Sequence, residues 1–260
     1  MKDIIYFIKQ STYNFKNAYA LRASFWTGVF GMMLNNIAFF VIWVLFMEAT
    51  GPIGGWNSMD VVGMLGISLV TFGVTHAFFY GIVDLPQSVV KGSFDQTLLS
   101  PVSTFLKISG SSFSVTAFGD LLEGLIIVIV YGIYLGLSFY GWMLLLLGIL
   151  SGCVIFLCIR LLCSLVVFFV YDGEVVSAQL FDIFLRPGLY PGPIFPEKLK
   201  IFFMTIIPTL ITSAIPIDIL KAHSLKLAGW SIFITLVWVG ITYAVFTLAI
   251  KRYESGNLLR

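Results

Sequence analysis

The chain has 260 residues, of which 59% are hydrophobic and only 11% are charged. A soluble domain is typically about 25% charged, so this composition excludes a water-soluble surface and indicates lipid as the solvent. It also excludes a disordered chain, a collagen and a disulfide scaffold, and a formal net charge of +2 gives no reason to expect a nucleic-acid partner. The sequence therefore predicts an all-α membrane protein that crosses the bilayer several times.

Residues 1–22 predict an amphipathic helix in the membrane interface. Apolar residues such as Ile5 and Ile8 recur at helical spacing, while Lys2, Lys9 and Lys16 lie a heptad apart on another face. A soluble packing helix is the alternative, but the span that follows favours the interface. The segment lacks the short apolar region and cleavage site of a signal peptide, so we expect it to be retained.

Six apolar segments are long enough to cross the hydrocarbon, which takes about 20 residues. They are residues 25–46, 61–83, 112–137, 142–170, 199–219 and 227–250. Residues 23–260 are expected to form one transmembrane domain. Only residues 138–141 join the third and fourth spans, which predicts a tight antiparallel hairpin. Pro208 and Pro216 interrupt the fifth span, where we expect kinks or a break.

Basic residues in the connections predict the orientation, because Lys and Arg remain on the cytoplasmic side. With the N-terminus inside, twelve basic residues are expected on the cytoplasmic side: Lys2, Lys9, Lys16, Arg22, Lys91, Lys107, Arg186, Lys198, Lys200, Lys251, Arg252 and Arg260. Only Lys221 and Lys226 would lie outside, and Arg160 falls within the fourth span. Both termini are therefore expected in the cytoplasm.

Motifs for catalysis or metal binding are missing from the sequence. It contains neither a G-x-x-x-x-G-K-[ST] phosphate loop nor an H-E-x-x-H pair, and His76 and His223 are too few for a histidine metal site. Cys153, Cys158 and Cys163 are five residues apart, which rotates successive thiols by about 140° on a helix. We therefore expect no enzymatic activity, metal or cofactor in this chain.

Three charges lie inside the third and fourth spans. Asp120 and Glu123 are three residues apart and face the same way on a helix. Asp120 and Arg160 are equally far from the turn near residue 140, which predicts one depth close to the cytoplasmic boundary. We expect Arg160 to pair with Asp120, Glu123 or both, as a structural contact in preference to a substrate or proton relay.

Two G-x-x-x-G pairs flank the same turn: Gly132 with Gly136, and Gly148 with Gly152. Gly132 and Gly148 are equally far from the turn, which suits close approach of two helices. We expect these glycines to serve packing within the hairpin in preference to contact between two copies of the chain.

The second cytoplasmic connection, residues 84–107, is the most informative segment. Gly92 is expected to break the chain and Pro101 to end the short helix that follows. That helix would present three apolar side chains on one side: Phe94, Leu98 and Leu99. They would contact either another protein or the membrane and the spans, and spacing alone does not favour one over the other.

A resemblance favours the protein contact. The run Gly-Ser-Phe-Asp-Gln-Thr-Leu-Leu-Ser-Pro from Gly92 to Pro101, the six spans and the amphipathic N-terminal helix resemble the permease subunits of type-2 ABC exporters. A second block agrees, with Tyr190-Pro191, Ile194-Phe195 and the two prolines of the fifth span. The chain departs from the pattern at Ser100, where relatives commonly carry a basic residue.

The resemblance implies an ATP-driven exporter of the bacterial cytoplasmic membrane. Two permeases, identical copies or paralogues, would form the translocation path, and separate ATPase subunits would bind ATP and Mg. Residues 84–107 would include the coupling helix, with its interface at Gly92, Phe94, Leu98, Leu99 and Pro101. The alternative is a secondary transporter that uses the intramembrane charges and a proton or ion gradient.

Overall fold

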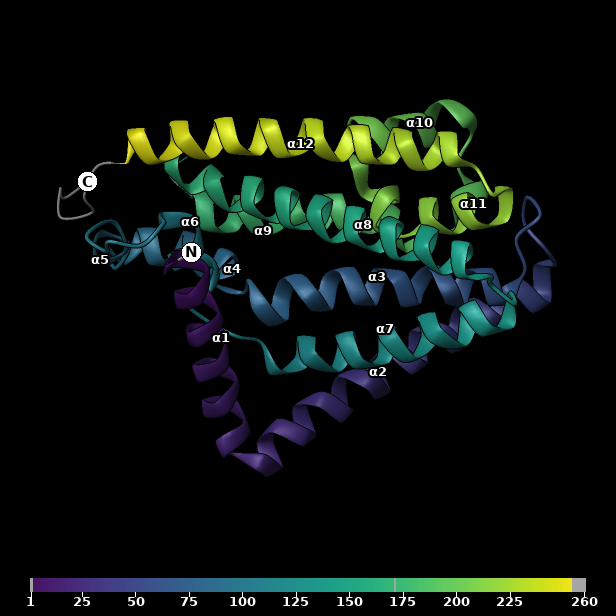
Figure 1. Ribbon diagram of the computed structural model, residues 1–260, viewed down its shortest axis with the longest axis horizontal. Helices are drawn as coiled ribbons and strands as arrows, with labels where there is room; N and C mark the ends of the chain where they lie inside the picture. Colours follow the sequence, from purple (N-terminus) through teal and green to yellow (C-terminus); the bar gives the residue numbers. More distant parts are fainter. Residues whose placement is uncertain (1, 171, 254–260) are drawn as a thin grey trace.

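Helices form the regular structure of the described residues, 2–170 and 172–253, in a computed structural model of the chain (Figure 1). Five of these helices are long and apolar enough to cross a membrane: α2 (Arg22–Thr50), α3 (Ser58–Phe78), α7 (Val115–Tyr134), α8 (Phe139–Leu165, continued by the 3-10 turn η1, Val166–Phe168) and α12 (Leu225–Arg252). The predicted all-α class is confirmed for this part of the chain.

The long helices lie along one common direction, with α2 and α7 running toward one end of the bundle and α3, α8 and α12 running toward the other (Figure 1). Both ends of the described chain lie at one end of the bundle, which we call the terminal end. The connections 51–57, 135–138 and 223–224 lie at the other, which we call the loop end. Arg260, one of the basic residues expected in the cytoplasm, lies outside the described residues.

Small residues let α3 and α7 pack closely against each other. A Cβ atom added to Gly73 would lie 2.6 Å from the backbone nitrogen of Leu121, and one added to Gly124 would lie 2.7 Å from that of Val70. Glycine permits this approach because it has no side chain to separate the backbones. The helix α2 packs against α7 and also contacts α3.

The predicted tight hairpin of the third and fourth spans does not form. The helix α7 packs against α3 and α2, whereas α8 packs against α12, α3 and the later helices, so α3 lies between the two arms (Figure 1). The short turn fixes only the loop ends of α7 and α8. The glycines of α3 then decide which neighbour α7 takes.

The predicted fifth span, 199–219, breaks at Pro208 as expected, but it does not run from one end of the bundle to the other, so the predicted crossing is wrong. It is divided into α10 (Glu197–Thr205), η4 (Pro208–Thr212) and α11 (Ala214–Ala222). The carbonyl of Thr205 accepts a hydrogen bond of 3.0 Å from Trp238, which lies about 18 Å along α12 from Lys226. At the end of α11, Lys221 donates to the carbonyl of Gly55 at 2.7 Å.

Residues 197–222 therefore enter and leave the bundle at the loop end. We call this segment the re-entrant hairpin. The break falls at Pro208, which has no backbone N–H to donate. Pro216 lies in the first turn of α11, where its missing N–H removes no intrahelical bond.

The chain reaches the loop end through α9 (Gly173–Leu185) and the 3-10 turns η2 (Arg186–Leu189) and η3 (Gly192–Ile194). Together α9 and η2 span roughly 28 Å, close to the thickness of the hydrocarbon. The ring of Tyr190 then packs against Trp43 near the loop end of α2, with 5.8 Å between centroids. Three charges, at Glu174, Asp182 and Arg186, lower the mean hydropathy of this segment, so hydropathy alone does not identify it as a span.

The predicted distribution of basic residues is wrong at this point. Lys198 and Lys200 begin the re-entrant hairpin and lie at the loop end with Lys221 and Lys226, while Arg186 lies between the two ends. The terminal end keeps the larger group of described basic residues: Lys2, Lys9, Lys16, Arg22, Lys91, Lys107, Lys251 and Arg252.

The helix α1 (Lys2–Ala20) runs across the direction of the long helices at the terminal end (Figure 1). It is held by α6 (Thr104–Ser109) and the turn after it: Lys107 donates to the Tyr6 hydroxyl at 2.8 Å, and Asn14 donates to the carbonyl of Gly110 at 2.9 Å. None of the side chains of α1 is buried. Its three isoleucines, Ile4, Ile5 and Ile8, are exposed, and the interfacial position of this helix stays a prediction.

Candidate functional site

The connection between α3 and α7 forms a folded structure at the terminal end. It contains α4 (Gly81–Val90), α5 (Asp95–Leu98) and α6. Gly92 has φ of +71°, a left-handed conformation that favours glycine, and it turns the chain from α4 into α5. Pro101 follows α5 and is exposed.

The three apolar residues of this connection do not share one surface. Leu99 is 86% exposed and Leu98 is 38% exposed, but Phe94 is only 1% exposed. The Phe94 ring packs against the rings of Tyr253 and Phe168, with centroid distances of 4.9 and 5.5 Å. The expectation that Phe94 lies beside the two leucines on the outer side is therefore wrong.

The neighbours of Phe94 explain the difference. Tyr253 follows α12 and Phe168 follows α8, so both are far from Phe94 in the sequence. Tyr253 also donates a hydrogen bond of 2.7 Å from its hydroxyl to Asp95. Phe94 thus attaches the connection to the ends of two spans, and of the three predicted apolar residues only Leu98 and Leu99 are exposed.

The intramembrane charges form two separate groups. Asn36 of α2 donates from its amide nitrogen to Asp120 at 2.7 Å and to Glu123 at 3.0 Å. Arg160 of α8 instead lies over the ring of Phe181, with its guanidinium carbon 4.5 Å from the centroid. Among the described residues Arg160 forms no ion pair with either carboxylate, so the predicted pair is wrong.

The physical reason is again that α3 separates α7 from α8. Equal distance from a turn gives equal depth, but it does not make two helices neighbours. Residue patterns missed Asn36, although an amide inside an otherwise apolar span is a signal that a polar partner lies nearby.

His76 belongs to the group around Arg160. Its ring stacks on Phe72 at 3.9 Å, its Nδ1 lies 3.2 Å from the Phe72 carbonyl, and its centroid is 5.9 Å from that of Phe181. In the described ranges, no group of three His, Cys, Asp or Glu side chains is placed to hold a metal ion.

The four predicted packing glycines have different neighbours. A Cβ on Gly132 would lie 2.3 Å from the indole of Trp142, and Gly136 ends α7 with φ of +59°. A Cβ on Gly148 would lie 2.9 Å from Pro216, and one on Gly152 would lie 2.8 Å from Thr71. Gly148 and Gly152 therefore allow the re-entrant hairpin and α3, rather than α7, to pack closely against α8.

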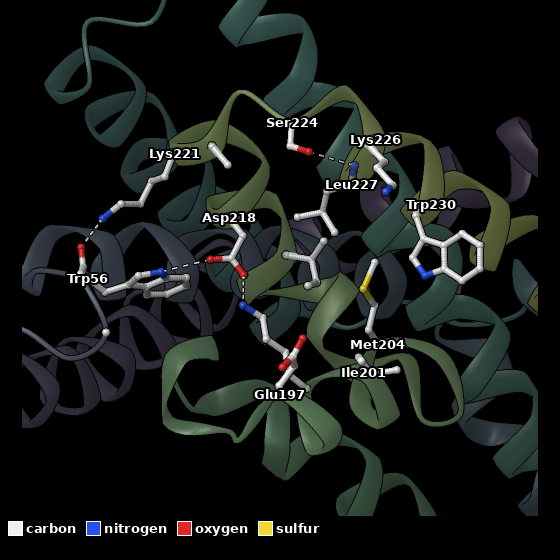
Figure 2. A pocket seen from close by; sticks show the side chains of 15 residues that line it. Trp56, Glu197, Ile201, Met204, Asp218, Lys221, Ser224, Lys226, Leu227 and Trp230 are labelled. Atoms are coloured by element: carbon white, nitrogen blue, oxygen red, sulfur yellow. Dashed lines mark hydrogen bonds and ion pairs between the residues drawn. The ribbon is translucent and has the colours of Figure 1, made fainter.

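A polar network that the sequence analysis missed ties three helices together at the loop end. Asp60 of α3 accepts a hydrogen bond of 2.8 Å from the hydroxyl of Tyr131 and forms an ion pair with Lys221 of α11. Asp60 and Asn57 also cap α3 reciprocally. Beside this network is a cavity of about 970 Å³ between the re-entrant hairpin and α12 (Figure 2).

The long apolar helices and their short connections define a multi-pass integral membrane protein. Residues 33–256 match the family described as ABC-2 family transporter protein. This match covers most of the chain, so the chain belongs to the ABC-2 family of transporter membrane proteins. No curated protein and no solved structure matches it.

Family membership makes the chain a membrane component of an ABC transporter. Membrane proteins of this family are permease subunits rather than ATPases, and membership implies association with ABC ATPase subunits. It favours the permease over the secondary transporter as the interpretation of the sequence.

Proposed function

We propose that this chain is the permease subunit of an ATP-driven exporter, and that separate ATPase subunits bind ATP and Mg. The observation that carries the proposal is the family match over residues 33–256. The preponderance of basic residues at the terminal end supports a cytoplasmic position for that end. The bacterial cytoplasmic membrane is the location that we propose.

The ATPase would bind at the terminal end, where Leu98 of α5 and the next residue, Leu99, are exposed. Exposed leucines on a short helix outside the apolar bundle suit a cleft on another protein. Gly92 sets the turn into this helix and Pro101 follows it, so both belong to the proposed interface by their backbone role. Phe94 would hold the interface in position from the inner side.

A second permease, either an identical copy or a paralogue, would complete the translocation path. The long helix α2 supports this assignment, because most of its apolar side chains are exposed: Phe30, Leu34, Ile37, Val41, Ile42 and Leu45. In the assembly, lipid or the second permease would cover this face.

The coupling would operate through contacts at the terminal end. ATP-driven closure of the ATPases would displace α5, and the packing of Phe94 on Tyr253 and Phe168 would pass this displacement to the ends of α12 and α8. The hydrogen bond of 2.6 Å from Ser112 to Asp84 links α4 to the segment that enters α7. ATP would thus shift the population of permease conformations through its partner.

The test is co-purification of the ATPase with tagged chain in detergent. We expect replacement of both Leu98 and Leu99 by Asp to abolish capture of the ATPase while leaving membrane insertion unchanged. Leu225→Asp is the matched control, because Leu225 is 63% exposed but lies at the loop end. Undiminished capture by the double variant, or equal loss in the control, would contradict the assignment.

A further inference from the structure

The cavity at the loop end has the size and the lining of a ligand site. Its volume of about 970 Å³ lies within the range of roughly 300–1,000 Å³ that small-molecule pockets occupy. Its walls come from α10, α11, α12 and the connection 54–56 (Figure 2). Since the re-entrant hairpin forms two of these walls, the cavity exists only because residues 197–222 return to the end where they entered.

Polarity changes with depth along the wall formed by α10. Glu197, Lys200, Ile201 and Met204 line the cavity at spacings of three, four and seven residues, so they form one face of the helix. The two charged residues lie nearest the loop end, and the two apolar residues lie deeper. This face therefore suits a molecule with a polar head and an apolar tail.

The other two helices repeat this gradient. On α12, Lys226 lies one turn closer to the loop end than Trp230, and both line the cavity. On α11, Asp218 and Lys221 lie closer to the loop end than Ile215 does. Trp230 is 49% exposed, so protein does not close off the apolar part of the cavity.

Most of the charges at the cavity mouth already have partners. Lys200 pairs with Asp218 at 2.6 Å, and Lys221 pairs with Asp60. Asp218 also accepts a hydrogen bond of 3.2 Å from the indole of Trp56. Within the described part of the chain, Glu197 and Lys226 line the same mouth without forming an ion pair.

These two charges have opposite signs and come from opposite sides of the mouth, α10 and α12 (Figure 2). Lys226 is in the first turn of α12, where the helix dipole adds positive potential. The lysine side therefore suits a phosphate, and the glutamate side suits an ammonium group. A head group that carries both charges would satisfy the two residues together.

We propose that this cavity binds a membrane phospholipid with a zwitterionic head group. The phosphate contacts Lys226 and the first turn of α12, and the ammonium group contacts Glu197. The upper parts of the acyl chains lie along Trp230, Ile201 and Met204. The site is independent of ATPase binding, because it lies at the opposite end of the bundle from α5.

Native mass spectrometry of the purified full chain tests the proposal. The protein is delipidated and titrated with phosphatidylethanolamine or phosphatidylglycerol, which share the phosphate and differ in the ammonium group. We expect one phosphatidylethanolamine to bind about tenfold more tightly than phosphatidylglycerol, as the loss of one charge-assisted contact predicts. Equal binding of the two lipids would overturn the proposal.

Two neutral variants separate the roles of the charges. Glu197→Gln should remove the preference for phosphatidylethanolamine, while Lys226→Gln should lower the binding affinity for both lipids. Lys198→Gln is the matched control, since Lys198 is exposed on α10 but does not line the cavity. An equal loss in the control would show that the lipids respond only to surface charge and would overturn the site. If Lys226→Gln does not fold, the selective effect of Glu197→Gln decides the question.

The acyl contacts and the head group are tested separately. Trp230→Ala should lower the binding affinity for both lipids. Tyr243→Ala should leave it unchanged, because Tyr243 is exposed on α12 outside the cavity. Phosphoethanolamine without acyl chains should fail to compete with the lipid. Full competition by phosphoethanolamine would identify a site for a soluble phosphate compound and would overturn the lipid assignment.

Discussion

At the scale of single residues, Asn36 supplies the hydrogen-bond donors that two buried carboxylates of α7 require. Asp120 and Glu123 lie on the same face of a span and are buried, and each needs a donor. A side-chain amide offers two N–H groups, and those of Asn36 reach one oxygen of each carboxylate. The same interaction attaches α2 to α7, because the donor and the acceptors are on different helices.

We expect Asn36→Leu to destabilise the protein. The change leaves two buried carboxylates without their donor, and a buried polar group without a partner costs about 1–3 kcal/mol. Thermal unfolding in detergent, followed by tryptophan fluorescence, measures the loss. Asn35→Leu is the control, because Asn35 is exposed on the adjacent position of α2. A midpoint for Asn36→Leu equal to that of the control would contradict this role.

Replacing all three polar groups should restore much of that stability. Apolar residues at 36, 120 and 123 remove the donor and both acceptors together, which is far less costly than removing the donor alone. The triple variant should therefore unfold at a higher temperature than Asn36→Leu in the same detergent. A triple variant that is less stable than the single one would show that the carboxylates have further partners.

At the scale of elements, hydropathy predicted where helices form better than what they contact. Residues 25–46 and 227–250 were located correctly because no charged residue interrupts them. Residues 199–219 were equally apolar, but composition does not distinguish a segment that crosses from one that returns. Pro208 correctly indicated the break but not the return of the chain to the same end. The passage through α9 was missed because its three charges lower the hydropathy of that segment, and Phe94 was misplaced because its partners are distant in sequence.

The close contact between α3 and α7 leads to a prediction at this scale. Gly73→Leu should strongly destabilise the bundle, because its Cβ alone would lie 2.6 Å from the backbone of Leu121. Overpacking typically costs about 1–3 kcal/mol, and a backbone neighbour cannot move as a flexible side chain does. Gly229→Leu on α12 is the control, since no atom lies within 4 Å of its added Cβ. Yield and thermal midpoint in detergent should fall for Gly73→Leu and remain unchanged for the control.

At the scale of the whole molecule, the re-entrant hairpin gives the two ends different roles. The terminal end holds most of the basic residues and the exposed leucines of α5, while the loop end holds the charged cavity and the Asp60 network. An energy-supplying partner at one end and a lipid at the other would act on the same long helices. The helix α12 connects the two, from Lys226 at the cavity to its last residue, after which Tyr253 lies beside Phe94.

This arrangement places Lys198 on the opposite side of the membrane from Leu99, whereas a continuous span over 199–219 would put both in the cytoplasm. Lys198→Cys and Leu225→Cys should therefore react with a membrane-impermeant maleimide in intact cells, and Leu99→Cys should react only after permeabilisation. The chain's own cysteines, Cys153, Cys158 and Cys163, are buried or half-buried in α8, and their replacement by Ala removes any background. Labelling of Lys198→Cys together with Leu99→Cys, and not with Leu225→Cys, would show that the hairpin crosses the membrane. The position of Lys198 decides between the two topologies. A re-entrant hairpin places the basic residues at 198 and 200 outside, whereas a continuous span places them in the cytoplasm.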